Sequence, residues 1–258
     1  MLLTKNLSQD AISKDTAEAS GKKASFRFAT MLLVIVFAST IGFFAISYFK
    51  HPVAVITGIS MLPNYTQDEV HVTTRTFITP ERFRVVLFKS EEINNPSANL
   101  LRQRMNISGN FAKRVMGVPG DVFTLSLDTG LFLTLNGQPF TYENDLSKPT
   151  FDVVDKSNIN TFVPAAYLYE TIGDKTHAVY ALATPKSSMT TEQSKLIEQS
   201  IIPLSTKALN GKVEGNVVTI KVPEGKLFLV SDNRVDGLDS RQLGFVPVHA
   251  VISVFEEK

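Results

Sequence analysis

The longest apolar run in the chain lies close to its start. Residues 29–49 contain no charged side chain, and a helix of this length spans the roughly 30 Å hydrocarbon core of a bilayer. A buried helix of a soluble domain rarely stays uncharged over such a length. A cleaved secretory signal would be shorter and would end at a small-x-small site, whereas this run follows a long polar lead and ends in Ser47-Tyr-Phe-Lys50. We predict a transmembrane anchor over residues 29–49.

After the anchor, the apolar positions fall into short segments that are typical of β-strands. Strands are predicted over residues 69–74, 84–88, 111–118, 131–135 and 138–142. Asn136-Gly137 lies between the last two, and this dipeptide is the strongest short-range signal for a hairpin. In Val118-Pro-Gly-Asp121, proline and glycine stand where a type II turn requires them.

Two further segments are not strand-like. Residues 91–108 are polar, contain Pro96 and precede Gly109, which favours a loop. Thr190 and Gln193 have the spacing of a capping box, which predicts a short helix through Ile201.

The charges around the anchor predict its orientation. Lys22, Lys23 and Arg27 precede the apolar run, and positively charged flanks remain on the cytoplasmic side of a membrane. We therefore expect a cytosolic tail over residues 1–28 and an extracytoplasmic domain over residues 50–258. An extended chain covers about 3.3 to 3.6 Å per residue, which keeps Ser60 within roughly 40 Å of the bilayer.

Composition narrows the range of functions. The chain has 258 residues, 43% of them hydrophobic and 20% charged, which suffices for one sizeable domain and a membrane segment. The formal charge of +1 gives no electrostatic reason to expect a nucleic-acid partner. The absence of cysteine excludes disulfides, thiol catalysis and cysteine-ligated zinc. We expect no cofactor and no metal.

A serine and a lysine are the candidate catalytic residues. Ser60 lies in the apolar turn Gly58-Ile-Ser-Met-Leu-Pro63, and its hydroxyl needs a base before it can attack an amide. The four histidines of the chain are scattered, whereas Lys113 shares one strand face with the apolar residues Phe111 and Val115. Burial lowers a lysine pKa, and reaching about 8 from about 10.4 would cost roughly 3 kcal/mol. Lys113 is therefore the expected base.

Three motifs in order resemble the conserved boxes of type I signal peptidases. They are Ser60-Met61-Leu-Pro63, Lys113-Arg114 with Gly117-x-Pro-Gly-Asp121, and Ser231-Asp-Asn-Arg-x-Asp-Gly-x-Asp-Ser-Arg241 with Gly244-Phe-Val-Pro247. The resemblance implies a mainly β catalytic domain with an inserted accessory β subdomain, here at about residues 141–218. Residues 170–182 resemble a strand region of that subdomain.

The resemblance also implies a function. It predicts a serine endopeptidase of the bacterial cytoplasmic (inner) membrane, with one span and a periplasmic catalytic domain. Its partners would be the lipid bilayer and preproteins or prepilins with small residues at the first and third positions before the cut, bound as an added β-strand. Ser60 and Lys113 would be catalytic, and the Ser60 backbone N–H would donate to the oxyanion. The expected supporting residues are Gly58, Met61, Pro63, Arg114, Ser231, Asp232, Asn233, Arg234, Asp239, Ser240 and Arg241.

The chain departs from the family pattern at three places. Gly237 stands where the family has a serine that orients the lysine, so that Ser231, Ser240 or a water would have to replace it. Phe83-Arg84 stands in place of Gly-Asp before a strand. Gly58 occupies a position at which some members carry an oxyanion hydroxyl, which leaves only a backbone donor.

The acids of the third motif have a structural explanation. As a calcium loop starting at Asp232 the motif fails, because Arg234 would stand at the third position and Leu243 at the twelfth, where oxygen ligands are required. We expect Arg234 and Arg241 to neutralise the acids of this loop beside the lysine.

Three alternatives to a general signal peptidase are open. Self-cleaving repressors of the SOS response share the serine and lysine chemistry but would carry a DNA-binding module where this chain has its apolar run. A specialised peptidase for prepilins or conjugative transfer would use the same dyad on other substrates. A catalytically degenerate membrane scaffold is suggested by the departures at Gly237 and Phe83-Arg84.

Overall fold

The computed structural model describes residues 28, 30–47, 51–75, 79–105, 108–154, 162–183, 185–200 and 204–256. The chain divides into two compact units, Met1–Lys50 and His51–Lys258. In the first unit, Thr30–Ser47 forms a helix long and apolar enough to cross a membrane. Its large apolar side chains, such as Leu33 and Phe43, are exposed. The polar tail predicted for residues 1–28 lies, apart from Phe28, outside the described residues.

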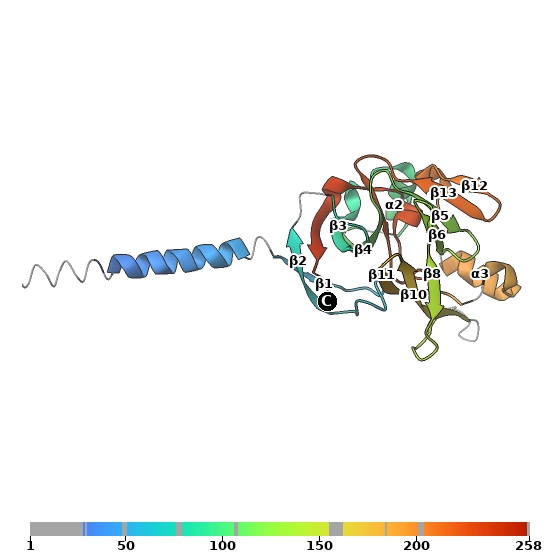
Figure 1. Cartoon of the computed structure of the whole chain (residues 1–258), viewed down its shortest axis with the longest axis horizontal. Coiled ribbons are helices and arrows are strands. Elements are labelled where there is room, and N and C mark those ends of the chain that lie inside the picture. Colours follow the sequence, from blue (N-terminus) through green and yellow to red (C-terminus); the bar gives the residue numbers. More distant parts are fainter. Residues whose placement is uncertain are drawn as a thin grey trace, which may run out of the picture. The chain divides into compact units, whose positions relative to one another are not determined.

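The second unit is mainly β, which confirms the predicted fold class (Figure 1). Its largest sheet has seven antiparallel strands. In spatial order they are β1 (Val53–Val55), β2 (Val70–Arg75), β16 (Val251–Phe255), β3 (Val85–Lys89), β4 (Asn110–Gly117), β14 (Lys226–Val230) and β15 (Val246–Pro247). The strands predicted at 69–74, 84–88 and 111–118 are therefore present, each shifted by one residue.

A second antiparallel sheet contains five strands. They are β12 (Lys212–Glu214), β13 (Val217–Lys221), β5 (Val122–Ser126), β6 (Phe132–Leu135) and β7 (Gln138–Pro139). Asn136 and Gly137 both adopt positive φ, 51° and 83°, as the predicted two-residue hairpin requires. Before β5, the Asp121 N–H donates to the Val118 carbonyl at 3.1 Å and Gly120 has φ of 89°, which is the predicted type II turn.

The accessory part is a four-stranded sheet (Figure 1). Its strands are β8 (Thr141–Asn144), β9 (Phe151–Val154), β10 (Phe162–Ile172) and β11 (Lys175–Leu182). Helix α3 (Thr191–Ser200) packs on β10 through Leu196 and Ile197, which cluster with Val163. Thr190 and Gln193 form the predicted capping box; Ile201, the predicted end of the helix, lies outside the described residues.

A cluster of phenylalanines joins the five-stranded sheet to the seven-stranded sheet. Phe123 of β5 lies 4.4 Å from Phe228 of β14 and 5.5 Å from Phe132 of β6, measured between ring centroids. All three are almost completely buried, and close aromatic pairs of this kind add to the free energy gained from burial. The cluster fixes β14, which lies beside β4, the strand that carries Lys113.

The prediction of a loop over residues 91–108 was wrong, because the segment contains η1 (Ser90–Glu92) and helix α2 (Pro96–Met105). Pro96 is the first residue of the helix, a position at which the missing N–H costs nothing. Asn95 precedes it, and its side chain accepts a hydrogen bond from the Ala98 N–H at 2.9 Å, as an N-cap does. The other short helices are η2 (Lys186–Ser188), α4 (Thr206–Leu209), α5 (Ser240–Leu243) and η3 (Val248–Ala250).

Candidate active site

Ser60 lies in the turn that follows β1. The next residue, Met61, is completely buried and packs in a cluster with Ile56 and Phe255, so that the turn is anchored on the sheet. The Leu62–Pro63 peptide bond is cis. Gly58 lies in open space, because a Cβ placed there would meet no atom within 4 Å. The turn thus holds Ser60 half-buried at the edge of a packed cluster.

The structure brings Ser60 and Lys113 together. Lys113 projects from β4, and its Nζ donates to Ser60 Oγ at 2.7 Å and to the Ala112 carbonyl at 3.0 Å. The amine also lies 5.5 Å from the centroid of the Phe111 ring, the neighbour expected from strand alternation. Only 4% of Lys113 is exposed.

Burial lowers the pKa of Lys113 to about 8. The physical cause is desolvation, which disfavours the charged ammonium. The negative charges of Asp239 and Asp232 act in the opposite direction and raise the pKa. Near pH 8, a substantial fraction of this amine is therefore neutral and able to accept a proton.

The loop between β14 and α5 makes hydrogen bonds to the backbone of the serine turn. The Asn233 N–H donates to the Ser60 carbonyl at 2.9 Å, and the Asn233 side chain donates to the Ile59 carbonyl at 3.3 Å. Asn233 thus binds the backbone carbonyls of both Ser60 and the residue before it. Asn233 is a positioning residue for this turn.

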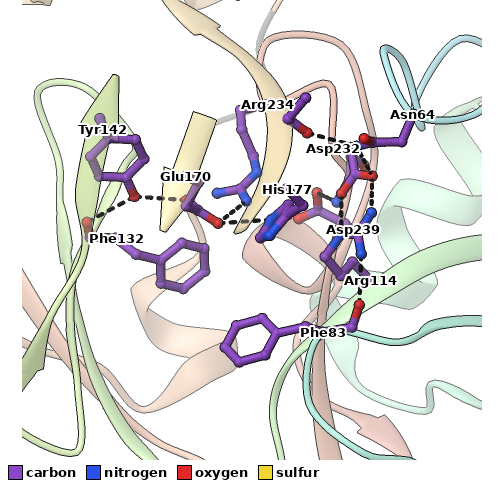
Figure 2. Close-up of polar contacts among 12 residues, drawn as sticks. Asn64, Phe83, Arg114, Phe132, Tyr142, Glu170, His177, Asp232, Arg234 and Asp239 are labelled. Carbon is purple, nitrogen blue, oxygen red and sulfur yellow. Dashed lines mark hydrogen bonds and ion pairs between the residues drawn. The ribbon is translucent and has the colours of Figure 1, made fainter. Parts of the chain in front are cut away.

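Arg114 and Asp232 fix this loop to β4 (Figure 2). The guanidinium makes a two-bond contact with the buried carboxylate, at 2.7 and 2.5 Å, and also donates to the Phe83 carbonyl at 2.6 Å. Asn64, which follows the serine turn, donates to the same carboxylate at 2.7 Å. Arg114 therefore has the structural surroundings expected of a supporting residue.

Phe83 has a positive φ of 68°, a conformation that favours glycine. The family pattern has Gly-Asp where this chain has Phe83-Arg84. The Phe83 ring packs against the phenylalanine cluster and lies 6.1 Å from the His177 ring, and its N–H donates to the Val115 carbonyl at 2.7 Å. Phe83 thus combines a strained backbone conformation with a ring that is packed against other side chains.

Asp239 and Arg241 form a second buried pair. Arg241 donates to both carboxylate oxygens of Asp239, at 2.9 and 2.8 Å, as predicted for the neutralisation of this acid. Asp239 is also the N-cap of α5 in a capping box with Gln242, and it accepts the Ser231 N–H at 2.8 Å. The Arg241 charge holds the pKa of Asp239 below its usual range although burial acts to raise it.

The expectation that Arg234 neutralises an acid of its own loop was wrong. Its guanidinium donates to Glu170 of β10 at 2.7 Å, and it lies 5.1 Å from the centroid of the Phe132 ring, a cation–π distance. Asp232 is instead neutralised by Arg114. The reason is the fold, because the β10 strand brings Glu170 close to this loop from 64 residues away.

Glu170 is the site residue that sequence reasoning missed (Figure 2). It is completely buried, accepts the Tyr142 hydroxyl at 2.7 Å, and lies 3.0 Å from His177 Nε2. Burial alone would raise the pKa of Glu170, but the Arg234 charge and the His177 contact lower it below the usual range. His177 lies opposite Glu170 in the β10–β11 hairpin, but Tyr142 and Arg234 come from distant segments, so that no local sequence signal marks the cluster. Glu170 ties the third motif to the accessory sheet.

Ser231 occupies the space that a side chain at position 237 would need. A Cβ on Gly237 would lie 2.1 Å from Ser231 Oγ and 2.6 Å from Ser231 Cβ, so that both side chains cannot be present in this arrangement. Within the described part of the chain, the buried Ser231 hydroxyl has no hydrogen-bond partner. Ser240 is differently placed, because its hydroxyl accepts the Leu229 N–H at 2.9 Å.

Ser60 and Lys113 open into a cavity of about 480 Å³. Most of its walls are apolar and come from residues 55–61, from Phe111 and Ala112, and from Leu238. Among the described residues, no group of three or more His, Cys, Asp or Glu side chains could hold a metal ion. The arrangement suits attack by a serine oxygen, with a lysine nitrogen beside it, on a substrate that fills a largely apolar cleft.

Comparison with known proteins finds a matching family model, a similar protein and a similar solved structure. Residues 28–256 match the family model described as signal peptidase, peptidase S26. The chain is 25% identical over 268 residues to the signal peptidase I of Buchnera aphidicola subsp. Schizaphis graminum (strain Sg), with 95% of this chain and 77% of that protein covered. A crystal structure of a signal peptidase I from Enterococcus faecalis V583 covers 69% of this chain and 98% of its own, at 20% identity and a TM-score of 0.29.

Proposed function

Because this chain belongs to the signal peptidase family S26, we propose that it is a membrane-bound serine endopeptidase that removes signal peptides from exported preproteins. Ser60 is the nucleophile and Lys113 is the general base. The observation that carries the proposal is the 2.7 Å hydrogen bond between Lys113 Nζ and Ser60 Oγ, made by an amine that is almost completely buried. This contact favours an active enzyme over a degenerate scaffold.

Catalysis proceeds by acyl transfer. Neutral Lys113 accepts the proton of the Ser60 hydroxyl while Oγ attacks the scissile carbonyl carbon. The resulting ammonium donates its proton to the leaving amine as the carbon–nitrogen bond breaks, which leaves an acyl-Ser60 ester. Lys113 then takes a proton from a water that attacks the ester, and returns it to Oγ as the ester bond breaks.

The Ser60 backbone N–H serves as an oxyanion donor. In the described part of the chain this N–H makes no hydrogen bond, so that it is available to the developing charge. One such donor is worth about 3 to 4 kcal/mol in serine proteases. The open space at Gly58 is the place where a second donor, a hydroxyl, would fit.

Ser231 takes over the role of the lysine-orienting serine that Gly237 lacks. Val230, the last residue of β14, pairs with Arg114 of β4, and continuing this register by one residue would set Ser231 opposite Lys113. Opposite residues of an antiparallel pair share one face with Cβ atoms about 4.5 to 5.5 Å apart. We infer that the unpartnered Ser231 hydroxyl turns toward the amine when substrate is bound. Glycine at position 237 leaves the space that this hydroxyl fills.

The bilayer is the second partner. Residues 29–49 are the anchor, with residues 1–28 as a cytosolic tail and the peptidase domain over 50–258 on the outer side of the bacterial inner membrane. On β1 and β2, Val53 pairs with Val72 and Val55 with Val70, and all four are at least half exposed. An exposed apolar patch of this kind marks an interaction surface, and we assign it to lipid.

The substrates are preproteins with small residues at the first and third positions before the cut. The apolar walls of the cavity suit small side chains, and β1 (Val53–Val55) and residues 110–112 of β4 offer strand edges to a peptide. Residues 141–218 form the accessory insert, which supports the catalytic loop through Glu170. Prepilins with the same cleavage pattern are alternative substrates of the same site.

The first prediction concerns the two proposed catalytic groups. In detergent, the purified protein is expected to cleave a preprotein with an Ala-x-Ala site, and Ser60→Ala or Lys113→Met is expected to slow cleavage by at least about a thousandfold. Lys113→Met should unfold at the same or a higher temperature, because it removes a buried amine. Lys195→Met, on the exposed face of α3, is the matched control and should cleave normally. Full activity in either dyad variant would refute the assignment.

The second prediction concerns pH. The neutral amine is the active form, so kcat/KM is expected to reach its plateau above the pKa of about 8 and to fall about tenfold per pH unit below it. A pH profile of peptide cleavage between pH 5 and 10 measures this limb. A midpoint near 6.5 would instead point to a histidine base.

The third prediction concerns Ser231 and Gly237. Gly237→Ser alone is expected to lower both thermal stability and activity, because its Cβ would clash with the Ser231 side chain. Ser231→Gly alone should keep the fold but lower kcat by about tenfold, through loss of the hydrogen bond that we propose this hydroxyl makes to the amine during catalysis. The double variant with both substitutions should recover activity. A double variant no better than Gly237→Ser would contradict the exchange of roles.

The fourth prediction concerns topology. Protease added to spheroplasts is expected to digest the domain that follows the anchor, while a cytosolic marker protein remains intact. An epitope tag at the C-terminus, followed by immunoblotting, measures the digestion. Complete protection of the tag in spheroplasts, with digestion after detergent lysis, would place the domain in the cytoplasm.

A further inference from the structure

The cavity beside Ser60 contains an acid for which the catalytic mechanism has no use. Asp236 lines the cavity together with Ser60 and Lys113. Among the described residues that line it, Lys113 is the only other charged one. When Lys113 is in its neutral, active form, Asp236 is the one remaining charge on these walls.

Asp236 is held in place by the asparagine that positions the serine turn. Its backbone N–H donates to Asn233 Oδ1 at 3.2 Å, and the Asn233 N–H donates in turn to the Ser60 carbonyl at 2.9 Å. Two hydrogen bonds thus connect residue 236 to the nucleophile. The backbone of residue 236 is therefore held near the nucleophile, and its side chain lines the same cavity as Ser60.

Asp236 differs from the buried acids around it. Asp232, Asp239 and Glu170 each form an ion pair with an arginine. Asp236 is exposed, and no ion pair of its carboxylate occurs among the residues that the structure describes. The fold thus neutralises the acids that stabilise the loop but leaves the one that faces the cavity without a cation.

A bound peptide changes the surroundings of this carboxylate. The peptide displaces water from a cleft with largely apolar walls, which strengthens electrostatic interactions within it. A cationic side chain next to Asp236 compensates the charge, whereas an acidic one adds repulsion, and such pairs determine specificity more than overall affinity.

We propose that Asp236 is a specificity-determining residue that favours substrates with lysine or arginine close to the scissile bond, at a position other than the first or third before it. The inference rests on the proposed peptidase function and adds a charge preference to it. Asp236 does not take part in the proton transfers. It acts on the substrate by attraction across the cleft.

A different role for Asp236 would be to act on Lys113. The negative charge of Asp236 raises the pKa of Lys113, although by less than Asp239 and Asp232 do. Loss of the carboxylate would then move the acid limb of the pH profile to lower pH by the same amount for every substrate. A charge preference for the substrate would be absent. The two roles therefore differ in one respect: an effect through Lys113 is the same for every substrate, whereas a direct effect on the substrate depends on the charge of the peptide.

The experiment is a charge scan of the substrate. Peptides with one Ala-x-Ala site carry a single Lys, Gln or Glu at the second position before the cut or at the first, second or third position after it. Wild type, Asp236→Asn and Asp236→Lys are compared by kcat/KM, with Asp174→Asn, an exposed acid on the β10–β11 turn, as the control. Thermal unfolding shows that each variant is folded, and Asp236→Asn suffices if Asp236→Lys does not fold.

At one position, wild type is expected to prefer Lys over Gln by about two- to fivefold, with the effect mainly in KM. Asp236→Asn should abolish the preference and Asp236→Lys should turn it toward Glu, while Asp174→Asn keeps it. The preference should also weaken at high salt.

A flat scan in wild type, a preference unchanged in Asp236→Asn, or an equal change for all peptides with a shifted pH limb would each overturn the inference. Failure of the peptidase function itself has a different signature. Neutral Gln peptides would then be left uncut, or would be cut equally well by Ser60→Ala, and the inference would fall with it.

Discussion

The burial of one amine is the constraint on which the site depends. Only 4% of Lys113 is exposed, and its Nζ lies 2.7 Å from Ser60 Oγ. A lysine in such surroundings is less stable in its charged form, and this cost has to be offset by the packing of β3, β4 and β14 around it. The same burial that lowers the stability of the fold lowers the pKa of Lys113 to about 8. A more exposed amine would destabilise the fold less, but with a pKa near the usual value of about 10.4 a far smaller fraction of it would be neutral at pH 8.

Three buried ion pairs stabilise the catalytic loop. Arg114 binds Asp232, Arg241 binds Asp239, and Arg234 binds Glu170. The net stability of such pairs is small, but removal of one partner leaves an uncompensated charge and costs about 3 to 5 kcal/mol. The third pair extends to β10, so that the accessory sheet takes part in positioning the loop (Figure 2). The accessory sheet therefore helps to position the catalytic loop, although it contributes no group to the dyad.

The departures from the family pattern have local explanations in the packing. At position 237 a side chain would clash with Ser231, so that glycine and serine are matched to each other in this chain. Phe83 adopts a backbone conformation suited to glycine and packs its ring against the phenylalanine cluster. Neither departure disturbs the contact between Lys113 and Ser60. Each change is accommodated by a neighbouring side chain.

The sequence by itself determined the features that short-range patterns encode. The uncharged run, the strands, the Asn136-Gly137 hairpin and the Thr190 capping box depend on residues within a few positions of one another, and the ordered motifs identified Ser60 and Lys113 as partners. Helix α2 was missed because Pro96 was taken as a breaker rather than as a first helical residue. Only the tertiary structure decided that Glu170 pairs with Arg234 and that Ser231 fills the space beside Gly237. These contacts join side chains brought together by the packing of separate strands and loops, and the partners of a buried charge or hydroxyl depend on that packing, which local propensity does not specify.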